Sequence, residues 1–417
     1  MTLITSQENY LKSSLYRQKC ILKSSIPLTP VDSIPFFTRE NTEFLHGLYI
    51  SDKVKSNHQK KESIISFPGR SRATFDVNMI HSELANLLGG EAGSLRLLSG
   101  LHAHLMVFMS LSKPGDSVLL LPENGGGHFA THSILERLGL RIINIPIDEE
   151  RMRVDRERTI LLIEKEKPNF IFIDRSEGLV YEDFSYLGDF KNAIKIFDAS
   201  QYLPQIIFNQ YENPIKWGFD LMLFSVHKSF PGPQKAGVVS RKKGDVWKNL
   251  VKGLGSYVSS AHIENTYNFG LVISNLSLLE SYSNKLSKSA LKLEECLMDL
   301  DGYVVDRSIY KEPKSNYTQH LWLSCRDKSE AFNIYRNLEL ARIHVNYRKL
   351  PYNLGWGIRI GTTSAIALGI NDDTIVSLAN VIKSIIYNGF CLRHRHLVRD
   401  IRKTMEENRL IEWPRMQ

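Results

Sequence analysis

Residues 221–239 read LMLFSVHKSFPGPQKAGVV, in which two apolar runs flank a His-Lys pair and a Pro-Gly-Pro turn. The first run predicts a buried strand, and Lys228 follows its end. Lysine is among the side chains least often buried in proteins. Lys228 is therefore either an ordinary residue of a surface loop or a reactive amine at the mouth of a parallel sheet.

Short apolar runs alternate with helical patterns on both sides of this stretch. Near-continuous apolar strands separated by helices predict a mainly parallel sheet covered on both faces, a doubly wound α/β fold whose ligands bind outside the carboxyl ends of the strands. We expect this large domain over residues 76–275, an N-terminal arm with few strong elements over residues 1–75, and a smaller α+β domain over residues 276–417. The predicted strands are 117–122, 141–147, 169–174, 193–200, 220–226, 237–241, 319–325 and 357–362.

The composition excludes several classes of protein. The chain has 417 residues, of which 42% are hydrophobic, but no apolar run reaches membrane-spanning length and the N-terminus lacks the apolar core of a secretory signal. The four cysteines lie far apart in the sequence, which indicates reduced thiols and no zinc site. We therefore expect a cytoplasmic protein without a bound metal.

The net charge of the chain is +8, and basic residues are concentrated at 53–61 and 392–403. We interpret the first segment as a mobile polar loop and the second as an amphipathic terminal helix. A nucleic-acid surface is the alternative, but nothing resembles the aromatic platform on which RNA bases stack. We therefore expect solvated basic faces and no nucleic-acid partner.

Side chains that can take part in acid–base or covalent chemistry lie where the predicted strands end. Asp198 ends one strand, while Ser225, His227 and Lys228 end another. His128 lies in a Gly-rich loop after a third strand. Each of these residues also has an ordinary interpretation, as a turn former, a loop histidine or a surface lysine. Because the carboxyl ends of parallel strands meet at one edge of a sheet, we expect all of them to lie close together.

A Ser-Gly pair, Ser99 and Gly100, immediately precedes a helical pattern. Alone, the pair is typical of an ordinary helix N-cap. Together with the strand-end residues, it matches what pyridoxal phosphate needs. The phosphate of that cofactor favours a helix N-terminus, its pyridine nitrogen a carboxylate, and its aldehyde a lysine that forms a Schiff base. One face of its ring favours a stacked aromatic side chain.

The chain resembles the serine hydroxymethyltransferase family of fold-type-I pyridoxal phosphate enzymes. The run VHKSFPGPQKAG is similar to the family's His-Lys-Thr-(x)2-Gly-Pro segment, and GGHFATH at 126–132 is similar to its Gly-Gly-His-Leu-Thr-His segment. The run GIRIGTTSAIALGI at 357–370 resembles the family's Arg-x-Gly-Thr segment, and ENY at 8–10 resembles an N-terminal motif. The similarity extends from residue 4 to about residue 370.

The resemblance implies a role for each matched residue. Lys228 would be the Schiff-base lysine, Asp198 the partner of the pyridine nitrogen, and His128 the residue that stacks on the cofactor. Arg359 would bind the carboxylate of the amino-acid substrate. The resemblance also implies a homodimer with a shared active site. The remaining implied cofactor contacts are Ser99, Gly100, Leu101, Gln201, Ser225 and His227, and the remaining implied substrate contacts are Tyr49 and Gln7.

The sequence departs from the family at the reacting end of the substrate. Folate-dependent members have a catalytic glutamate in a Tyr-x-Glu-Gly-Tyr-Pro-Gly segment, but the two possible alignments place Ile65 or Ser51 there. Gln201 also stands where the family has a titratable histidine. The run HKSFPGPQKAG is closer to the L-threonine transaldolase branch, which cleaves threonine through a glycyl quinonoid and adds that glycyl unit to a second aldehyde.

We therefore predict an enzyme that makes or breaks the Cα–Cβ bond of β-hydroxy-α-amino acids, with an amino acid and an aldehyde as substrates. His128 is the candidate for the β-hydroxyl proton. One alternative is a hydroxymethyltransferase acting on serine or α-methylserine. A second is other chemistry on the same cofactor, transamination or decarboxylation. A third is a non-catalytic relative that acts as a binding protein.

Overall fold

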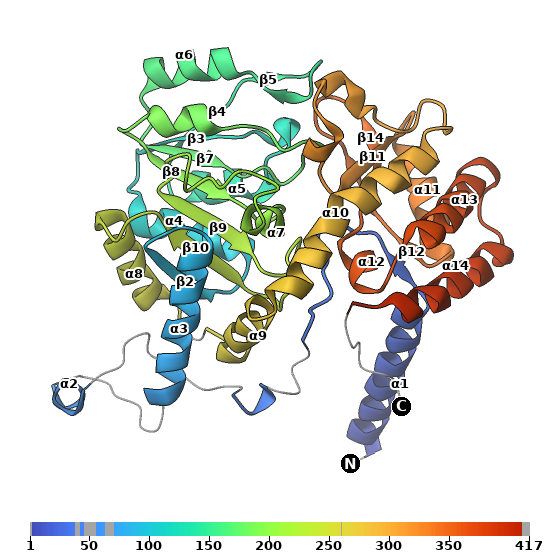
Figure 1. The fold of residues 1–417 in the computed structure, drawn as a ribbon, viewed down its shortest axis with the longest axis horizontal. Helices are drawn as coiled ribbons and strands as arrows, with labels where there is room; N and C mark the ends of the chain where they lie inside the picture. Colours follow the sequence, from blue (N-terminus) through green and yellow to red (C-terminus); the bar gives the residue numbers. More distant parts are fainter. Residues whose placement is uncertain (1, 38–41, 46–55, 63–70, 260, 411–417) are drawn as a thin grey trace.

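The computed structural model describes residues 2–37, 42–45, 56–62, 71–259 and 261–410. Within these residues the chain forms a large unit around a seven-stranded sheet and a smaller unit around a three-stranded sheet (Figure 1). The long helix α10 (Leu276–Leu297) runs between the two units. None of the helices in this described part of the chain is long and apolar enough to cross a membrane.

The seven-stranded sheet is mainly parallel, as expected. Five neighbouring strands, in the order β9-β8-β7-β3-β4, run parallel, and their carboxyl ends therefore meet at one edge. The bounds of the seven strands are β2 Ala92–Leu97, β3 Ser117–Leu120, β4 Arg141–Asn144, β7 Phe170–Ile173, β8 Ile194–Asp198, β9 Leu221–Ser225 and β10 Ala236–Ser240.

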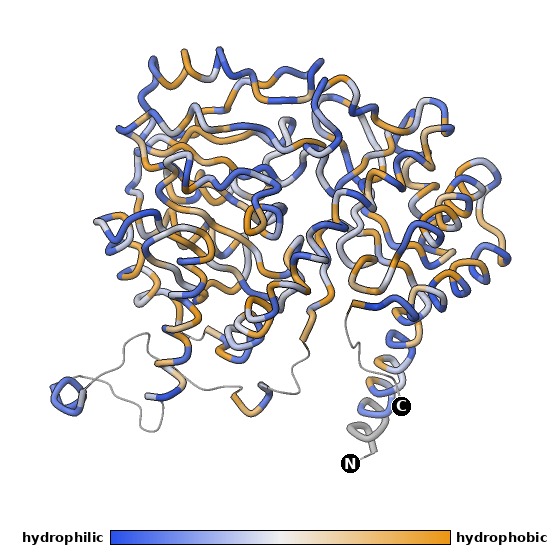
Figure 2. Tube along the Cα trace, viewed as in Figure 1, coloured by the Kyte–Doolittle hydropathy of each residue, from blue (hydrophilic) through white to orange (hydrophobic). Residues whose placement is uncertain are grey.

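Helices cover both faces of this sheet. Alternate residues of each strand point to opposite sides, and both sets of side chains are apolar and need to be buried. In β7, for example, Ile171 and Ile173 pack into one hydrophobic cluster, while Phe170 and Phe172 pack into another. The orange strands inside a bluer outer layer in Figure 2 show the same arrangement. The Phe170 side is covered by α4 (Gly100–Leu111), α5 (Phe129–Arg137) and α8 (Asp245–Tyr257), and the other side by α3 (Ser71–Leu87), α6 (Arg156–Glu166), α7 (Leu203–Ile207) and α9 (Ile263–Ile273).

The smaller unit contains an antiparallel sheet of order β11-β14-β13. Its central strand carries Arg359, which lies opposite Trp322 on one side and Asn346 on the other. A short pairing of β1 (Ile26–Pro27) with β12 (Ile343–His344) ties the N-terminal segment to this unit. The elements are β11 His320–Ser324, β13 Asn346–Lys349, β14 Trp356–Gly361, α11 Lys328–Leu340, α12 Thr363–Ala367, α13 Asp372–Asn388 and α14 Leu392–Met405.

Three expectations about individual elements were wrong or incomplete, and a fourth was confirmed. Residues Thr2–Lys23 form a 22-residue helix, α1, in the arm that was expected to contain few strong elements. Strand β2 was not predicted, and β10 runs antiparallel to both of its neighbours, β2 and β9. Residues Asn57–Lys61 of the expected polar loop form a short helix, α2, closed by a Ser56–Gln59 capping box. The expected terminal helix is present as α14.

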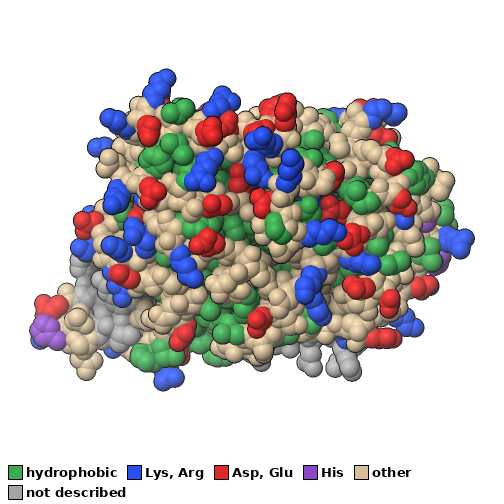
Figure 3. All heavy atoms as spheres, turned by 45° about the horizontal axis from the view of Figure 1, so that its top comes forward, with side chains coloured by type: hydrophobic (Ala, Val, Ile, Leu, Met, Phe, Trp, Pro, Cys, Tyr) green, Lys and Arg blue, Asp and Glu red, His purple; other side chains and the backbone are tan. Residues whose placement is uncertain are grey.

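The basic charge does not form one continuous surface on the face shown in Figure 3, where Lys and Arg side chains alternate with Asp and Glu. The helix α14 buries part of its basic stretch, since His394 and Arg402 are among its buried residues. The basic stretch of α14 is therefore only partly exposed, and the interpretation of both basic segments as solvated faces stays a prediction.

Candidate active site

The turn after β9 presents Lys228 at the edge where the parallel strands end. The backbone closes this turn, because the Val226 N–H donates to the Lys235 carbonyl at 2.8 Å and the Gly232 N–H donates to the Val226 carbonyl at 3.0 Å. The pKa of the Lys228 amine is lowered by desolvation and by Arg359, against the opposing effect of Asp198. A lowered pKa makes the neutral, nucleophilic amine more available at neutral pH.

Asp198 ends the neighbouring strand β8 and is 8% exposed. One carboxylate oxygen, Oδ1, accepts the Ser200 N–H at 2.7 Å, and the other, Oδ2, lies 2.7 Å from His104 Nε2. Burial alone would raise the pKa of Asp198, but His104 and Lys228 hold that pKa well below its ordinary value. Asp198 is therefore an ionised carboxylate in a largely buried setting.

Behind Asp198 lies a buried chain of polar groups that the sequence analysis missed. His104, on α4, places Nδ1 3.1 Å from the hydroxyl of Thr131, and that hydroxyl donates to Asp174 Oδ2 at 2.7 Å. Asp174 follows β7, and its other oxygen accepts the His128 N–H at 2.6 Å. Burial raises the pKa of Asp174 to about 6.

His128 begins α5 as its N-cap residue, with Nδ1 accepting the Ala130 N–H at 3.3 Å. Its half-buried ring stacks on Phe129, with ring centroids 5.0 Å apart and an interplanar angle of 20°. Burial, His104 and Lys228 lower the pKa of His128 to about 4. The ring is therefore neutral at neutral pH, which suits stacking and makes it a weak base.

A cluster of small residues lies where the first turn of α4 meets the end of β9. Ser99 is the N-cap of α4, and the Ser200 hydroxyl donates to the Ser225 hydroxyl at 3.1 Å. A Cβ added at Gly100 would lie 2.4 Å from Ser225 Oγ, so any other residue there would have to displace this hydroxyl. This junction joins the free N–H groups of a helix N-terminus to buried hydroxyls, a combination that suits a phosphate.

Gln201 adds a second sign that the site accommodates a ligand. Its side chain is 1% exposed, yet neither its amide nitrogen nor its oxygen has a hydrogen-bond partner among the described residues. Buried polar groups are rarely left unpaired, so a bound group is the natural partner. Together, the amine of Lys228, the carboxylate of Asp198, the glycine-lined helix end and the orphaned amide fit the group expected from the sequence.

Arg359 reaches the same region from the small sheet, and it is 3% exposed. Its Nη1 lies 3.1 Å from Oε1 of Glu177, and Arg348 of β13 contacts the same oxygen. Neither Glu177 nor Arg348 was foreseen. The clamp expected for a substrate carboxylate therefore faces a carboxylate of the chain itself.

Several expected site residues stay predictions. Tyr49, Ser51 and Ile65 lie outside the described residues, and Gln7 belongs to α1 but its side chain is not described. The side chain of Leu101 is 40% exposed, so a contact would involve its backbone at the start of α4. The ring of His227 lies against the backbone of Lys235, with Nδ1 3.2 Å from that carbonyl oxygen, a contact across the turn that holds Lys228.

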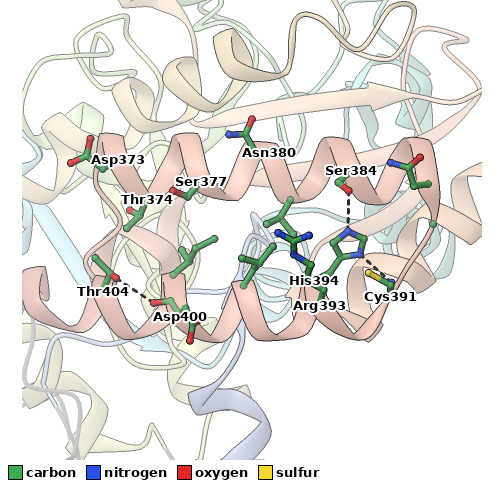
Figure 4. Close-up of a pocket in the computed structure, with 15 residues that line it drawn as sticks. Asp373, Thr374, Ser377, Asn380, Ser384, Cys391, Arg393, His394, Asp400 and Thr404 are labelled. Carbon is green, nitrogen blue, oxygen red and sulfur yellow. Dashed lines mark hydrogen bonds between the residues drawn. The ribbon is translucent and has the colours of Figure 1, made fainter.

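A partly open pocket lies away from this site. It has a volume of about 730 Å³ between α13 and α14, and Ser384 and His394 are among its lining residues (Figure 4). His394 Nδ1 accepts the Cys391 N–H at 3.1 Å, so Nε2 carries the proton and donates to Ser384 at 3.0 Å. His394 cannot then deprotonate Ser384, and the arrangement is a helix cap rather than a nucleophilic pair.

No protein-family model matches the chain. The chain is 27% identical over 356 residues to the serine hydroxymethyltransferase of Saccharolobus solfataricus, which covers 82% of this chain and 80% of that protein. It is 27% identical over 374 residues to the serine hydroxymethyltransferase of Archaeoglobus fulgidus, which covers 85% and 83%.

The structure is similar to that of an L-threonine transaldolase from Pseudomonas fluorescens in internal aldimine state. The TM-score is 0.85 and the sequence identity 17%, and the match covers 99% of this chain and 95% of that one. This likeness confirms the expected fold, a mainly parallel doubly wound α/β architecture of fold type I with a smaller second unit.

Proposed function

Because the chain is a serine hydroxymethyltransferase-like protein, we propose that it is a pyridoxal-phosphate-dependent enzyme that makes or breaks the Cα–Cβ bond of β-hydroxy-α-amino acids. The observation that carries this proposal is the meeting of Lys228 and the ionised Asp198 at one sheet edge, beside the helix end at Ser99–Gly100. Pyridoxal phosphate supplies an electron sink that lets a bond to Cα break while its electron pair stays on the amino acid.

Each residue of the site has a defined task in this proposal. Lys228 holds the cofactor covalently, and its lowered pKa favours that bond. Asp198 pairs with the pyridine nitrogen, and its low pKa keeps it a carboxylate that can hold a proton there. The neutral ring of His128 stacks on the cofactor, while the first turn of α4 and Ser225 hold the phosphate.

Arg359 binds the carboxylate of the amino acid and so orients its Cα bonds. A charge-assisted pair between an arginine and a carboxylate is strong and directional, and burial of Arg359 strengthens it further. Orienting the bond to be broken is a large part of what such a site contributes. A threonine-like donor is favoured, because the family's folate-linked glutamate aligns with Ile65 or Ser51 here.

A side-by-side assay tests the reaction. We expect threonine, or another β-hydroxy amino acid, to release its aldehyde, and added aldehydes to be converted to new β-hydroxy-α-amino acids. Folate-dependent glycine formation from serine, without aldehyde release from threonine, would favour the hydroxymethyltransferase alternative. Activity as a transaminase or decarboxylase alone would reject the Cα–Cβ proposal.

The cofactor bond has its own test. Borohydride reduction followed by peptide mapping should place the cofactor on Lys228. Lys228→Ala should lose the absorbance of the lysine-bound cofactor near the edge of the visible region. Lys242→Ala, which replaces an exposed lysine near the end of β10, serves as the control. A cofactor found on another lysine would reject the site, and a chain that binds no cofactor would favour the non-catalytic alternative.

We also propose that the chain forms a homodimer. The helix α1 supports this proposal, because it projects from the smaller unit with large apolar side chains in solvent, including Leu15 at 67% and Tyr16 at 68% exposure. Exposed apolar patches of this kind mark interaction sites. Light scattering of the purified chain should give twice the 47.8 kDa chain mass, and a monomer would reject the proposal.

A further inference from the structure

Glu177 places a buried carboxylate beside Arg359, the residue proposed to bind the substrate carboxylate. It lies in the loop after β7 and is 1% exposed. Its N–H donates to the Gly126 carbonyl at 3.0 Å, and a Cβ added at Gly126 would lie 2.2 Å from the Glu177 carbonyl oxygen. The backbone of Glu177 is therefore pinned against the loop that carries His128.

Two arginines approach Glu177 from the other unit. Asn346 of β13 lies opposite Arg359 of β14, and Arg348 follows Asn346 by two residues. Because alternate residues of a strand share a face, Arg348 and Arg359 project from the same side of the small sheet. Both contact one oxygen of Glu177, Oε1, at the junction of the two units.

This cluster holds two guanidinium groups but only one buried carboxylate, because the second acid near Arg348, Glu123, lies 3.6 Å from it and is 59% exposed. Among the described residues the second oxygen of Glu177, Oε2, has no hydrogen-bond partner. The Nε of Arg359 is also buried without a partner among these residues. A substrate carboxylate bound to Arg359 would give this guanidinium group its own carboxylate partner and leave Glu177 paired with Arg348.

We infer that Glu177 is the catalytic residue that accepts the β-hydroxyl proton of the substrate, while Arg348 holds it in place. This inference rests on the proposed function. In cleavage the O–H bond and the Cα–Cβ bond break and the aldehyde C=O bond forms. The proton goes to Glu177, and the electron pair stays on Cα. In the addition direction Glu177 returns the proton to the new hydroxyl.

This assignment supplies the carboxylate that the family pattern lacks at Ile65 or Ser51, and it proposes Glu177 in place of His128 for the β-hydroxyl proton. The Nδ1 of His128 already accepts a backbone N–H, and its ring face is committed to stacking. Glu177 has an unpaired oxygen beside the arginine that binds the substrate. A positioned general base of this kind contributes about 10²–10⁴-fold to a rate.

The test compares two reactions of the holoenzyme that share every binding contact. Cleavage of a β-hydroxy amino acid needs the hydroxyl proton to move, whereas exchange of the glycine α-proton with deuterium does not. The donor is the one that the wild type cleaves fastest among threonine, allothreonine and phenylserine. Glycine affinity, measured from the change in cofactor absorbance, gives a readout that is independent of turnover.

For Glu177→Gln we expect cleavage to fall by about 10²–10⁴-fold, with glycine exchange retained and glycine affinity unchanged or tighter. Glu123→Gln is the matched control, because Glu123 also lies near Arg348, at 3.6 Å, but is 59% exposed. The control should retain both reactions. Glu177→Asp, which keeps a shortened carboxylate, should recover part of the cleavage rate and serves if the glutamine variant does not fold.

An equal loss of cleavage and exchange would overturn the inference, because Glu177 would then act only by positioning the arginines. Unchanged cleavage would overturn it as well. A wild type that shows neither glycine exchange nor cleavage would reject the proposed function itself. Exchange without cleavage of any donor would reject the Cα–Cβ proposal, and the role of Glu177 with it.

Discussion

Replacing Asp174 by asparagine should make the stability of the cofactor-free chain less dependent on pH. The pKa of Asp174 is raised by burial from its ordinary 3.8 to about 6, so folding favours its protonated form. The contribution of the Asp174 carboxyl to the free energy of unfolding is therefore fully present below about pH 4 and is lost as the pH rises through about 6. Above that pH the folded chain carries the cost of burying an ionised carboxylate.

The size of that cost follows from the difference between the pKa values of 3.8 and about 6. At 1.36 kcal/mol per unit, the ionised form costs about 3 kcal/mol at pH 8. An entropy of unfolding near 2.1 cal/mol/K per residue gives about 0.9 kcal/mol/K for a chain of this length, so 3 kcal/mol corresponds to about 3 °C in Tm. Asparagine keeps an oxygen for the His128 N–H and has no charge to bury.

The assay is the Tm of the wild type and of Asp174→Asn between pH 5 and pH 8. About half of the 3 kcal/mol is already lost at pH 5, so across this range we expect the Tm of the variant, relative to the wild type, to rise by about 1.5 °C. Asp183→Asn is the control, because Asp183 is exposed and only accepts the Ser185 N–H. A Tm difference between wild type and Asp174→Asn that stays constant with pH would refute the reasoning.

Four further predictions concern the ligands of the site. Gly100→Ala should release pyridoxal phosphate during gel filtration, because its Cβ would lie 2.4 Å from Ser225 Oγ, whereas Gly244→Ala has no atom within 4 Å and should retain it; equal retention would contradict the phosphate assignment. Asp198→Asn should keep the cofactor bound but slow glycine α-proton exchange measured by NMR, since an amide cannot hold the pyridine proton; an unchanged rate would count against that pairing. Arg359→Ala should weaken glycine binding by about 10–100-fold in an absorbance titration, from about 1.5–3 kcal/mol per charged hydrogen bond, and an unaltered affinity would place the substrate carboxylate elsewhere. Tetrahydrofolate should not accelerate glycine formation from serine in a discontinuous assay, and a clear acceleration would restore the hydroxymethyltransferase alternative.

The edge of the sheet where the site lies could be predicted from sequence alone. The apolar runs before Asp198 and Lys228 are local patterns, and parallel strands bring their carboxyl ends together whatever the loops do. The same rule would have found Asp174, since it follows the apolar run FIFI of β7. The family motifs added the roles of these residues, and the confirmed fold places them at one edge.

Other features of the fold left no strong local signal. The helix α1 was missed because its apolar residues, such as Leu11, Leu15 and Tyr16, are separated by polar ones, and within the described chain they stay exposed and do not form a buried face. The reversed direction of β10 could not be predicted from sequence either, because a fully buried strand has the same apolar composition in either direction.

Only the tertiary structure decided which groups support the catalytic ones. Helix α4 carries histidines at 102 and 104, and only packing shows that the ring of His104, not that of His102, turns toward Asp198. Glu177 and Arg359 are separated by more than 180 residues and meet because the small sheet packs against the carboxyl edge of the large one. Local sequence specifies the strand or helix that carries a residue. The partner of a buried charge depends on how separately folded units pack, because charges interact through space with whatever lies within a few ångströms.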